Sequence, residues 1–347
     1  HDHPRIYQEM AVDPVVLGHE LTMTIMKVGE NLKDQYRPGQ RFTIQADIYE
    51  NGVSYAYGYY YQGAMSQFGV IDGRVLKSDG GNNNLLPLKD STGYAEGALA
   101  EPWACVVAAY GLEYRTNFQQ DGILWFIGNG DDRDFSLDAD FFMASAPKEI
   151  WVTKVPSNFV TRLEELGKTF KEVEAVDAVV DESVDDIVML GYDAEKLKAA
   201  SQKLNKFGVF CVMSNEPIDE KISLDLGRVH YQRWLYTAST GLEIAEAYQK
   251  SLPRNTLKPG GKVLFAGAGG PIGRMHVQRA IEFSDPPKTI VCTDVSNLRL
   301  ADLKNTYGDQ AIEKGIDIIF SNPMEKEKYN TLIDSIQDRK STRLNSS

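Results

Sequence analysis

The stretch that most constrains the fold is the run VLFAGAGGPIG at residues 263–273, where an apolar segment ends in closely spaced glycines. Residues 274–282 continue with helical periodicity, and Asp294 ends the next apolar run, TIVCTD. A buried strand, a glycine loop, a helix and a distal acid are the parts of a dinucleotide-binding βαβ unit. In such units the backbone N–H groups at the helix N-terminus bind a pyrophosphate. The sequence therefore predicts a dinucleotide site in this segment.

The glycine spacing fits this motif in one of two registers. Counted from Gly267, it is one residue longer than G-x-G-x-x-G; counted from Ala268, it fits, with Ala in place of the first Gly. A carboxylate at Asp294 favours NAD over NADP because it repels a 2′-phosphate, and the nearby Arg299 weakens that preference. A tight βα turn that binds nothing is the alternative. The predicted cofactor-binding residues are Gly267, Gly269, Gly270, Pro271, Ile272, Gly273, Asp294 and Arg299.

The pattern of apolar runs and turn signals divides the chain into three segments, as expected for 347 residues. Residues 1–118 have short β-type runs at 21–28, 41–46 and 67–71, separated by Gly and Pro turns, which indicates a β-barrel-like domain. Residues 119–257 and 258–337 alternate strands with helices, which predicts an α/β fold with two tandem Rossmann-like, doubly wound units. The second unit is incomplete. The expected strands are 123–127, 149–155, 186–190, 208–213, 263–266, 289–293 and 316–320, and the expected helices include 160–172 and 194–207.

Both ends of the sequence differ from those of an ordinary gene product. Residues 338–347, DRKSTRLNSS, match the in-frame translation of a common sequencing adapter, so we expect them to be an artefact outside the fold. The sequence starts at His1 without an initiator Met and without a cap or strand signal. We therefore expect a chain truncated at both ends.

Composition excludes several classes of partner. A net charge of −12 and a pI near 5.0 argue against nucleic acid and anionic membranes. No apolar run approaches the roughly 18 uncharged residues of a membrane span. The three isolated cysteines, Cys105, Cys211 and Cys292, provide no disulfide framework and suit a reducing cytoplasm, and we expect Cys105 to be a core residue.

The first α/β unit has a glycine loop that suits a dinucleotide poorly. Gly128-Asn129-Gly130 is followed by Asp131, Asp132 and Asp134, with no third glycine, and Lys154 stands where the ribose-binding acid belongs. Three carboxylates at the place of a pyrophosphate are electrostatically unfavourable. We therefore interpret this unit as a Rossmann-like domain kept for structure or assembly.

Two motifs in the first segment carry a family resemblance. Residues 16–20 read VLGHE and residues 97–102 read GALAEP. Together with the glycine loop they resemble the zinc-dependent medium-chain dehydrogenases, and EGALAEP resembles the sorbitol or polyol dehydrogenase branch. The resemblance covers residues 10–118 and 258–337, and implies a GroES-like β-barrel catalytic domain. Residues 224–230, LDLGRVH, look like the family's return from the cofactor domain to the catalytic domain.

The resemblance also implies a catalytic zinc. Its ligands map to His19 and Glu101, with Glu20 as a neighbouring or exchanging carboxylate. The family's upstream Cys ligand has no counterpart, because no cysteine precedes His19. With two of three ligands, zinc binding should be weak and this chain inactive or nearly so. On the residues alone, His19-Glu20 could equally be a solvated or capping pair. The family's four-cysteine lobe is also missing, so no structural metal is expected.

The activity implied by the resemblance is reversible NAD-dependent oxidation of a secondary hydroxyl on a polyol, a sugar alcohol or its phosphate, by a cytoplasmic homo-oligomer. Two alternatives stay open: a zinc-free reductase of the same superfamily, and a non-catalytic NAD(H)-binding sensor or scaffold. Five tyrosines within residues 55–61 could line a substrate wall, although packing on the core is the simpler reading. We interpret His230 and His276 as structural, and His1 and His3 as belonging to an unstructured end.

Overall fold

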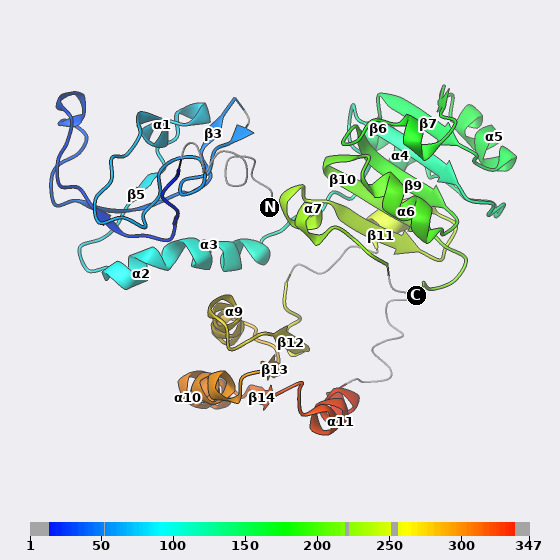
Figure 1. The fold of residues 1–347 in the computed structure, drawn as a ribbon. Helices are drawn as coiled ribbons and strands as arrows, with labels where there is room; N and C mark the ends of the chain where they lie inside the picture. Colours follow the sequence, from blue (N-terminus) through cyan, green and yellow to red (C-terminus); the bar gives the residue numbers. More distant parts are fainter. Residues whose placement is uncertain (1–13, 52, 219–221, 251–255, 337–347) are drawn as a thin grey trace. The chain divides into compact units, whose positions relative to one another are not determined.

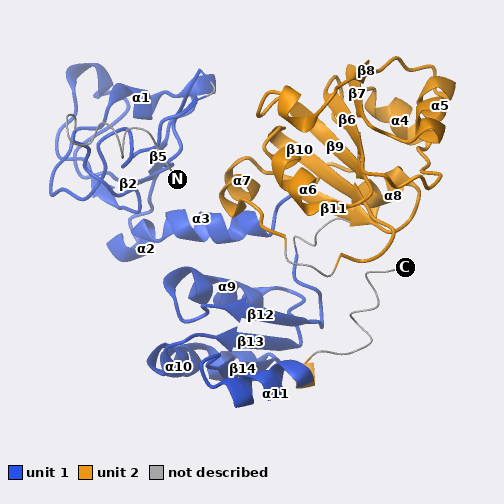
Figure 2. Ribbon diagram, turned by 45° about the vertical axis from the view of Figure 1, so that its right-hand side comes forward, with its two compact units in different colours: residues 1–112, 256–334 blue, residues 113–255, 335–347 orange. Residues whose placement is uncertain are grey.

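A computed structural model describes residues 14–51, 53–218, 222–250 and 256–336 (Figure 1). The chain forms two compact units: residues 1–112 with 256–334, and residues 113–255 with 335–347 (Figure 2). Unit 2 therefore interrupts unit 1 in the sequence, between helix α3 (Ala100–Ala109) and strand β12 (Lys262–Ala266). This insertion explains why the glycine loop of unit 1 comes so late in the chain.

The first part of unit 1 consists of short antiparallel strands and short helices. Strands β1, β2 and β5 form one sheet, and β3 pairs with β4 in a hairpin. Their bounds are β1 Met23–Thr24, β2 Arg41–Ile44, β3 Tyr49–Glu50, β4 Val53–Ser54 and β5 Leu85–Pro87. The helices are α1 Gly73–Leu76, α2 Tyr94–Ala98 and α3, with 3-10 turns at Glu30–Leu32 and Asp79–Gly81.

The second part of unit 1 is a three-stranded parallel sheet in the order β12-β13-β14, with the helices α9, α10 and α11. The bounds are α9 Pro271–Glu282, β13 Thr289–Thr293, α10 Asn297–Glu313, β14 Asp317–Ser321 and α11 Lys326–Ile336. Helix α9 packs against α3, so the two parts of unit 1 share a helix–helix contact. This arrangement is the βαβαβ half of a doubly wound fold.

Unit 2 has six parallel strands in the order β11-β10-β9-β6-β7-β8. Counted from β6, this is the 3-2-1-4-5-6 order of a complete Rossmann sheet. The strands are β6 Ile123–Gly128, β7 Glu149–Thr153, β8 Lys171–Glu172, β9 Val184–Leu190, β10 Leu204–Met213 and β11 Leu235–Ser239. The helices are α4 Ala139–Ser145, α5 Ser157–Glu165, α6 Ala194–Ser201, α7 Leu226–Tyr231 and α8 Ile244–Gln249, with a 3-10 turn at Val176–Ala178.

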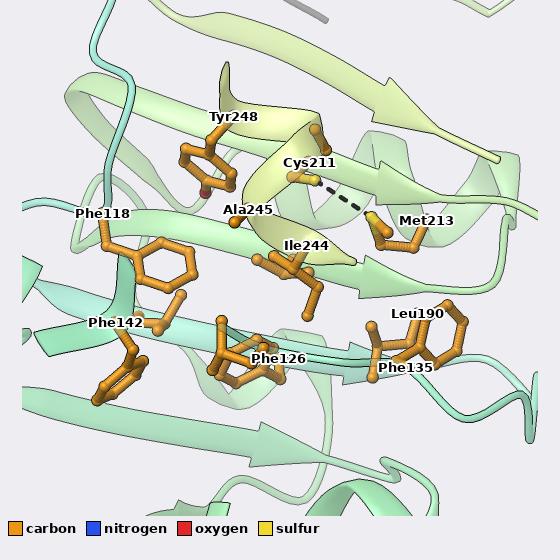
Figure 3. Packing of buried hydrophobic residues seen from close by; sticks show 14 of the residues in the cluster. Phe118, Phe126, Phe135, Phe142, Leu190, Cys211, Met213, Ile244, Ala245 and Tyr248 are labelled. Carbon is orange, nitrogen blue, oxygen red and sulfur yellow. Dashed lines mark hydrogen bonds between the residues drawn. The ribbon is translucent and has the colours of Figure 1, made fainter. Parts of the chain in front are cut away.

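Aromatic packing holds one face of this sheet (Figure 3). Phe118 makes edge-on contacts with Phe126 and with Tyr248 of α8. Cys211 and Met213 stand on the same face of β10, with their sulfur atoms 3.7 Å apart. Each fully buried Phe contributes about 1.5–3 kcal/mol to folding. The α/β architecture with parallel sheets that the sequence predicts is therefore present.

Several predicted elements differ from the observed ones. Residues 67–71 form no strand, and of the run 21–28 only Met23–Thr24 is strand. The predicted helix 160–172 ends at Glu165, and Lys171–Glu172 is the edge strand β8. The predicted helix 194–207 ends at Ser201, because the residues from Leu204 already pair with β9. Among the described residues, no helix combines the length and apolar character needed to cross a membrane.

Candidate metal and dinucleotide sites

The loop that carries His19 is held in place by backbone contacts with residues 63–65. The N–H groups of Gly63, Ala64 and Met65 donate to the carbonyls of Val16, Gly18 and Leu17 at 2.6, 2.9 and 2.9 Å. A Cβ at position 63 would lie 2.5 Å from the Gly18 carbonyl oxygen, so only glycine allows this approach. The two segments therefore fix the backbone on which His19 stands.

Helix α2, which leads directly into the helix that carries Glu101, is held against the segment that follows His19. The Thr22 hydroxyl donates to the Tyr94 carbonyl at 2.8 Å, at the start of α2. Gly97 permits this packing, because a Cβ there would lie 2.4 Å from the Thr22 hydroxyl. Pro102 sits in the first turn of α3, where its missing N–H costs no hydrogen bond. The sequence GALAEP thus places Glu101 at the N-terminus of α3, beside the His19 segment.

The structure brings His19, Glu20 and Glu101 together, although Glu101 lies more than 80 residues away in the sequence. One ligand atom from each lies within 4.8 Å of the other two. His19 and Glu101 are half-buried and Glu20 is exposed. One imidazole and two carboxylates are a donor set that suits zinc, and their separation allows closure by side-chain rotation. These residues therefore fit the metal that the sequence resemblance implies.

Cys105 is exposed, so the prediction that it is a core residue was wrong. The buried face of α3 carries Pro102 and Val106, which leaves Glu101 and Cys105 on another face. The Cys105 thiol donates to Glu101 Oε1 at 3.5 Å. Desolvation raises the pKa of this thiol, and the carboxylates of Glu101, Asp47 and Glu20 raise it further. The spacing of four residues between Glu101 and Cys105 would have placed both side chains on the same face of a helix, and so Cys105 at the site.

The tyrosine-rich segment divides between packing and the site. Tyr57 and Tyr61 are buried, and Tyr55 and Tyr60 pack against the same core cluster, as the packing interpretation requires. Tyr59 is exposed instead, and its ring centroid lies 5.4 Å from that of His19. The packing interpretation therefore holds for four of the five tyrosines, whereas the exposed ring of Tyr59 lies beside His19.

The glycine loop has the geometry of a phosphate-binding turn. Gly267 has a φ of 69°, in the left-handed region, and Gly270 is the N-cap of α9, with Pro271 in the first turn. A Cβ at Gly273 would lie 2.3 Å from the Gly267 carbonyl oxygen. The loop therefore folds back on the first turn of α9, so its backbone lies at the helix N-terminus, where the helix dipole favours an anion. Ile272 is exposed at this end.

Asp294 is buried beneath the loop. Its Oδ2 accepts the Gly269 N–H at 3.1 Å and its Oδ1 accepts the Ser296 N–H at 2.9 Å. A carboxylate has about four acceptor positions, so these two bonds leave capacity for a ribose hydroxyl. A Cβ at Gly269 would lie 2.6 Å from the Arg299 Cβ, which places the exposed Arg299 at the same loop. The eight predicted cofactor residues thus lie in the glycine turn, in the first turn of α9, directly after β13 and in the first turn of α10.

The corresponding loop of unit 2 is occupied by its own side chains. The Arg133 guanidinium pairs with Asp131 at 2.9 Å and also donates to the Thr240 carbonyl. Lys196 hydrogen-bonds the Asn129 side-chain oxygen, and Lys154 has a φ of 51° at the end of β7. Polar side chains of this loop thus already have partners within unit 2. A cavity of about 430 Å³ lies elsewhere, between α10, β14 and α11, and its lining includes none of the predicted site residues.

No protein-family model matches the sequence. The chain is 24% identical over 271 residues to mannitol-1-phosphate 5-dehydrogenase from Aliivibrio fischeri, covering 69% of this chain and 63% of the relative. It is 30% identical over 115 residues to L-sorbose 1-phosphate reductase from Klebsiella pneumoniae, covering 33% and 27%. Among solved structures, 2R,3R-butanediol dehydrogenase from Bacillus subtilis is 15% identical, covering 89% of this chain and 81% of that one, with a TM-score of 0.27. The chain thus spans less than two thirds of either curated relative.

Proposed function

We propose that the protein is a zinc-dependent oxidoreductase that transfers a hydride between NAD and the secondary hydroxyl carbon of a sugar alcohol or sugar-alcohol phosphate. The observation that carries the proposal is the convergence of His19, Glu20 and Glu101 within 4.8 Å. The glycine loop over Asp294 adds a place for the dinucleotide. The two curated relatives are named for sugar-phosphate redox reactions, which supports the substrate class. On this proposal the chain is a polyol-type member of the zinc-dependent medium-chain dehydrogenases.

Each residue then has a defined part. His19 and Glu101 hold the metal, and Glu20 is the adjacent carboxylate that can bind it or accept a proton. A zinc ion held by these residues would supply a Lewis acid that makes the substrate hydroxyl more acidic. The exposed ring of Tyr59 lies beside His19 and packs on the carbon chain of the substrate. Gly267–Gly273 bind the pyrophosphate through backbone N–H groups, and Asp294 binds the ribose.

The proposal is tested by following NADH formation by the zinc-loaded protein with mannitol, sorbitol and their 1- and 6-phosphates. Because the sequence has no counterpart of the family's upstream Cys ligand, only slow reduction of NAD is expected with at least one of these, together with its loss in Glu101→Ala and in His19→Ala. Cys292→Ala is the matched control, because this thiol is buried in the core of the parallel sheet of unit 1 and does not belong to the group of His19, Glu20 and Glu101. A protein that binds zinc and NADH but reduces NAD with none of these polyols would contradict the proposal and favour a non-catalytic NAD(H) sensor. Full activity in Glu101→Ala would instead favour a zinc-free reductase.

A further inference from the structure

Tyr61 anchors the tyrosine-rich segment to the rest of unit 1. The phenol is only 5% exposed, and its hydroxyl donates to Glu50 Oε1 at the end of strand β3. The Arg74 guanidinium lies over the ring, with its central carbon 4.5 Å from the ring centroid, and its Nε is 3.7 Å from the same Glu50 oxygen. Asp72 holds this guanidinium at 2.8 Å. Burial and the bond to Glu50 raise the pKa of Tyr61, so the phenol stays a hydrogen-bond donor.

The anchored residue closes a tight turn that reaches His19. The Gly58 N–H donates to the Tyr61 carbonyl at 2.9 Å, which closes the turn. Tyr59 lies within it, with its ring centroid 5.4 Å from that of His19. Gly58 has a φ of 79°, and a Cβ there would lie 2.6 Å from the Gly18 carbonyl oxygen. The turn therefore lies against His19 and against the backbone directly before it.

The four residues that follow Tyr61 also hold the His19 loop. The Gln62 side chain accepts the Val16 N–H at 2.7 Å and donates to the Pro14 carbonyl at 3.3 Å. Residues 63–65 donate three further backbone N–H groups to the carbonyls of residues 16–18. The turn before Tyr61 and the run after it therefore both end at the loop that carries His19.

We propose that Tyr61, held by Glu50 and Arg74, is a positioning residue for His19. The inference rests on the metal-binding role that the proposed function gives to His19. Removing the Tyr61 hydroxyl frees the turn and the run after it, so His19 samples more orientations, which metal binding must restrict again. Partners outside the ligand set commonly change metal affinity about 10- to 100-fold. Because Tyr61 acts through the backbone rather than on the imidazole, we expect the lower value, about tenfold.

The orientation of His19 can be measured without metal or turnover, by NMR of the histidine Cε1–H groups in the metal-free chain. His19→Ala identifies the resonance, which the nearby Tyr59 ring shifts. Tyr61→Phe, which keeps the ring and removes only the hydroxyl, should broaden this resonance or move it toward the value of an unfolded histidine. Tyr36→Phe is the matched control, because Tyr36 is a buried tyrosine of the same core cluster, with its hydroxyl bonded to Asn83. It should leave the His19 resonance in place.

Zinc affinity, measured by competition with a chelator, gives the second readout. Tyr61→Phe should bind zinc about tenfold more weakly than the wild type, and Tyr36→Phe equally well. Glu50→Gln keeps an acceptor for the Tyr61 hydroxyl and should retain most of the affinity that Glu50→Ala loses.

The inference is overturned if the His19 resonance is unchanged in Tyr61→Phe or in Glu50→Ala, or if Tyr36→Phe shifts it equally. It is also overturned if Tyr61→Phe binds zinc as tightly as the wild type. A chain that shows the expected His19 shift but binds no zinc would reject the proposed function and keep this inference, because the NMR measurement involves neither metal nor hydride transfer.

Discussion

The Tyr110 hydroxyl and His276 Nδ1 share a hydrogen bond of 2.9 Å, although 166 positions separate the two residues in the sequence. Tyr110 caps the C-terminus of α3, the helix of Glu101 and Cys105, and His276 lies in α9, directly after the glycine loop. Phe265 stacks on the same imidazole and Phe283 contacts the same phenol. The helix that carries Glu101 is thus tied to the helix that begins at the glycine loop.

This contact predicts a pH dependence of stability. Burial lowers the pKa of His276 from its ordinary value of 6.5, so the folded state favours the neutral ring. The resulting stabilisation is complete above pH 6.5 and is lost as the pH falls from 6.5 through the lowered value. We expect His276→Phe, which keeps an aromatic ring, to reduce the fall in melting temperature of unit 1 between pH 7.5 and 5.5. If the melting temperature of His276→Phe falls as much as that of the wild type, the pH dependence does not come from His276. His230→Phe in unit 2 is the control.

Close backbone packing predicts a second effect, at Gly63. Gly63→Ala places a methyl group 2.5 Å from the Gly18 carbonyl oxygen, so the His19 loop must move. We expect a cost of about 1–3 kcal/mol in the free energy of unfolding, together with weaker zinc binding. Gly29→Ala is the matched control, because nothing lies within 4 Å of a Cβ there. Equal zinc affinity in both variants, measured by chelator competition, would show that the loop does not position His19.

The dinucleotide loop gives a third prediction. Asp294→Ala removes the acceptor of the Gly269 and Ser296 N–H groups and the carboxylate that opposes a 2′-phosphate. We expect NAD binding to weaken about tenfold, equal to about 1.4 kcal/mol, and the preference over NADP to fall. Arg299→Ala should weaken NADP binding and leave NAD binding nearly unchanged. If calorimetry finds the same cofactor preference in Asp294→Ala and wild type, the ribose contact is misassigned.

The buried ion pair of unit 2 gives a fourth prediction. Arg115 Nη1 donates to Asp186 Oδ1 at 2.8 Å, and Asp186 is only 1% exposed. Arg115→Met removes the cation beside this buried carboxylate and leaves it only the Gln119 N–H and the Tyr248 hydroxyl as donors, which costs about 3–5 kcal/mol. The exposed pair of Lys250 and Glu246 offers a control, since Lys250→Met should cost less than about 1 kcal/mol. Urea unfolding followed by tryptophan fluorescence measures the loss of unfolding free energy in each variant. Equal losses would contradict the expected difference between the buried and the exposed ion pair.

Sequence patterns predicted the parts of this fold that depend on local order. The strand, loop and helix around Gly267–Gly273 follow from buried runs and glycine spacing, and the structure has them at nearly the expected residues. The ends of the predicted helices 160–172 and 194–207 were wrong, because pairing with neighbouring strands overrides helical propensity. The run at 67–71 has strand-like composition, but in the structure no neighbouring strand pairs with it.

The site was predictable to the extent that its residues belong to motifs. His19, Glu20 and Glu101 were named from VLGHE and GALAEP, and the structure brings their ligand atoms together. Cys105 was misjudged because CVVAA reads as an apolar run, whereas the helix turns this one side chain toward Glu101. Tyr59 could not be separated from its four neighbours, because only the folded loop shows which tyrosine lies beside His19.

Titration of the metal-free chain with zinc, followed by calorimetry, tests the central claim most directly. We predict one zinc per chain, with binding weakened at least a hundredfold in His19→Ala and in Glu101→Ala, and retained in Gly29→Ala. Absence of zinc binding by the wild-type chain, or equal affinity in all four proteins, would contradict the metal site on which the proposed chemistry depends.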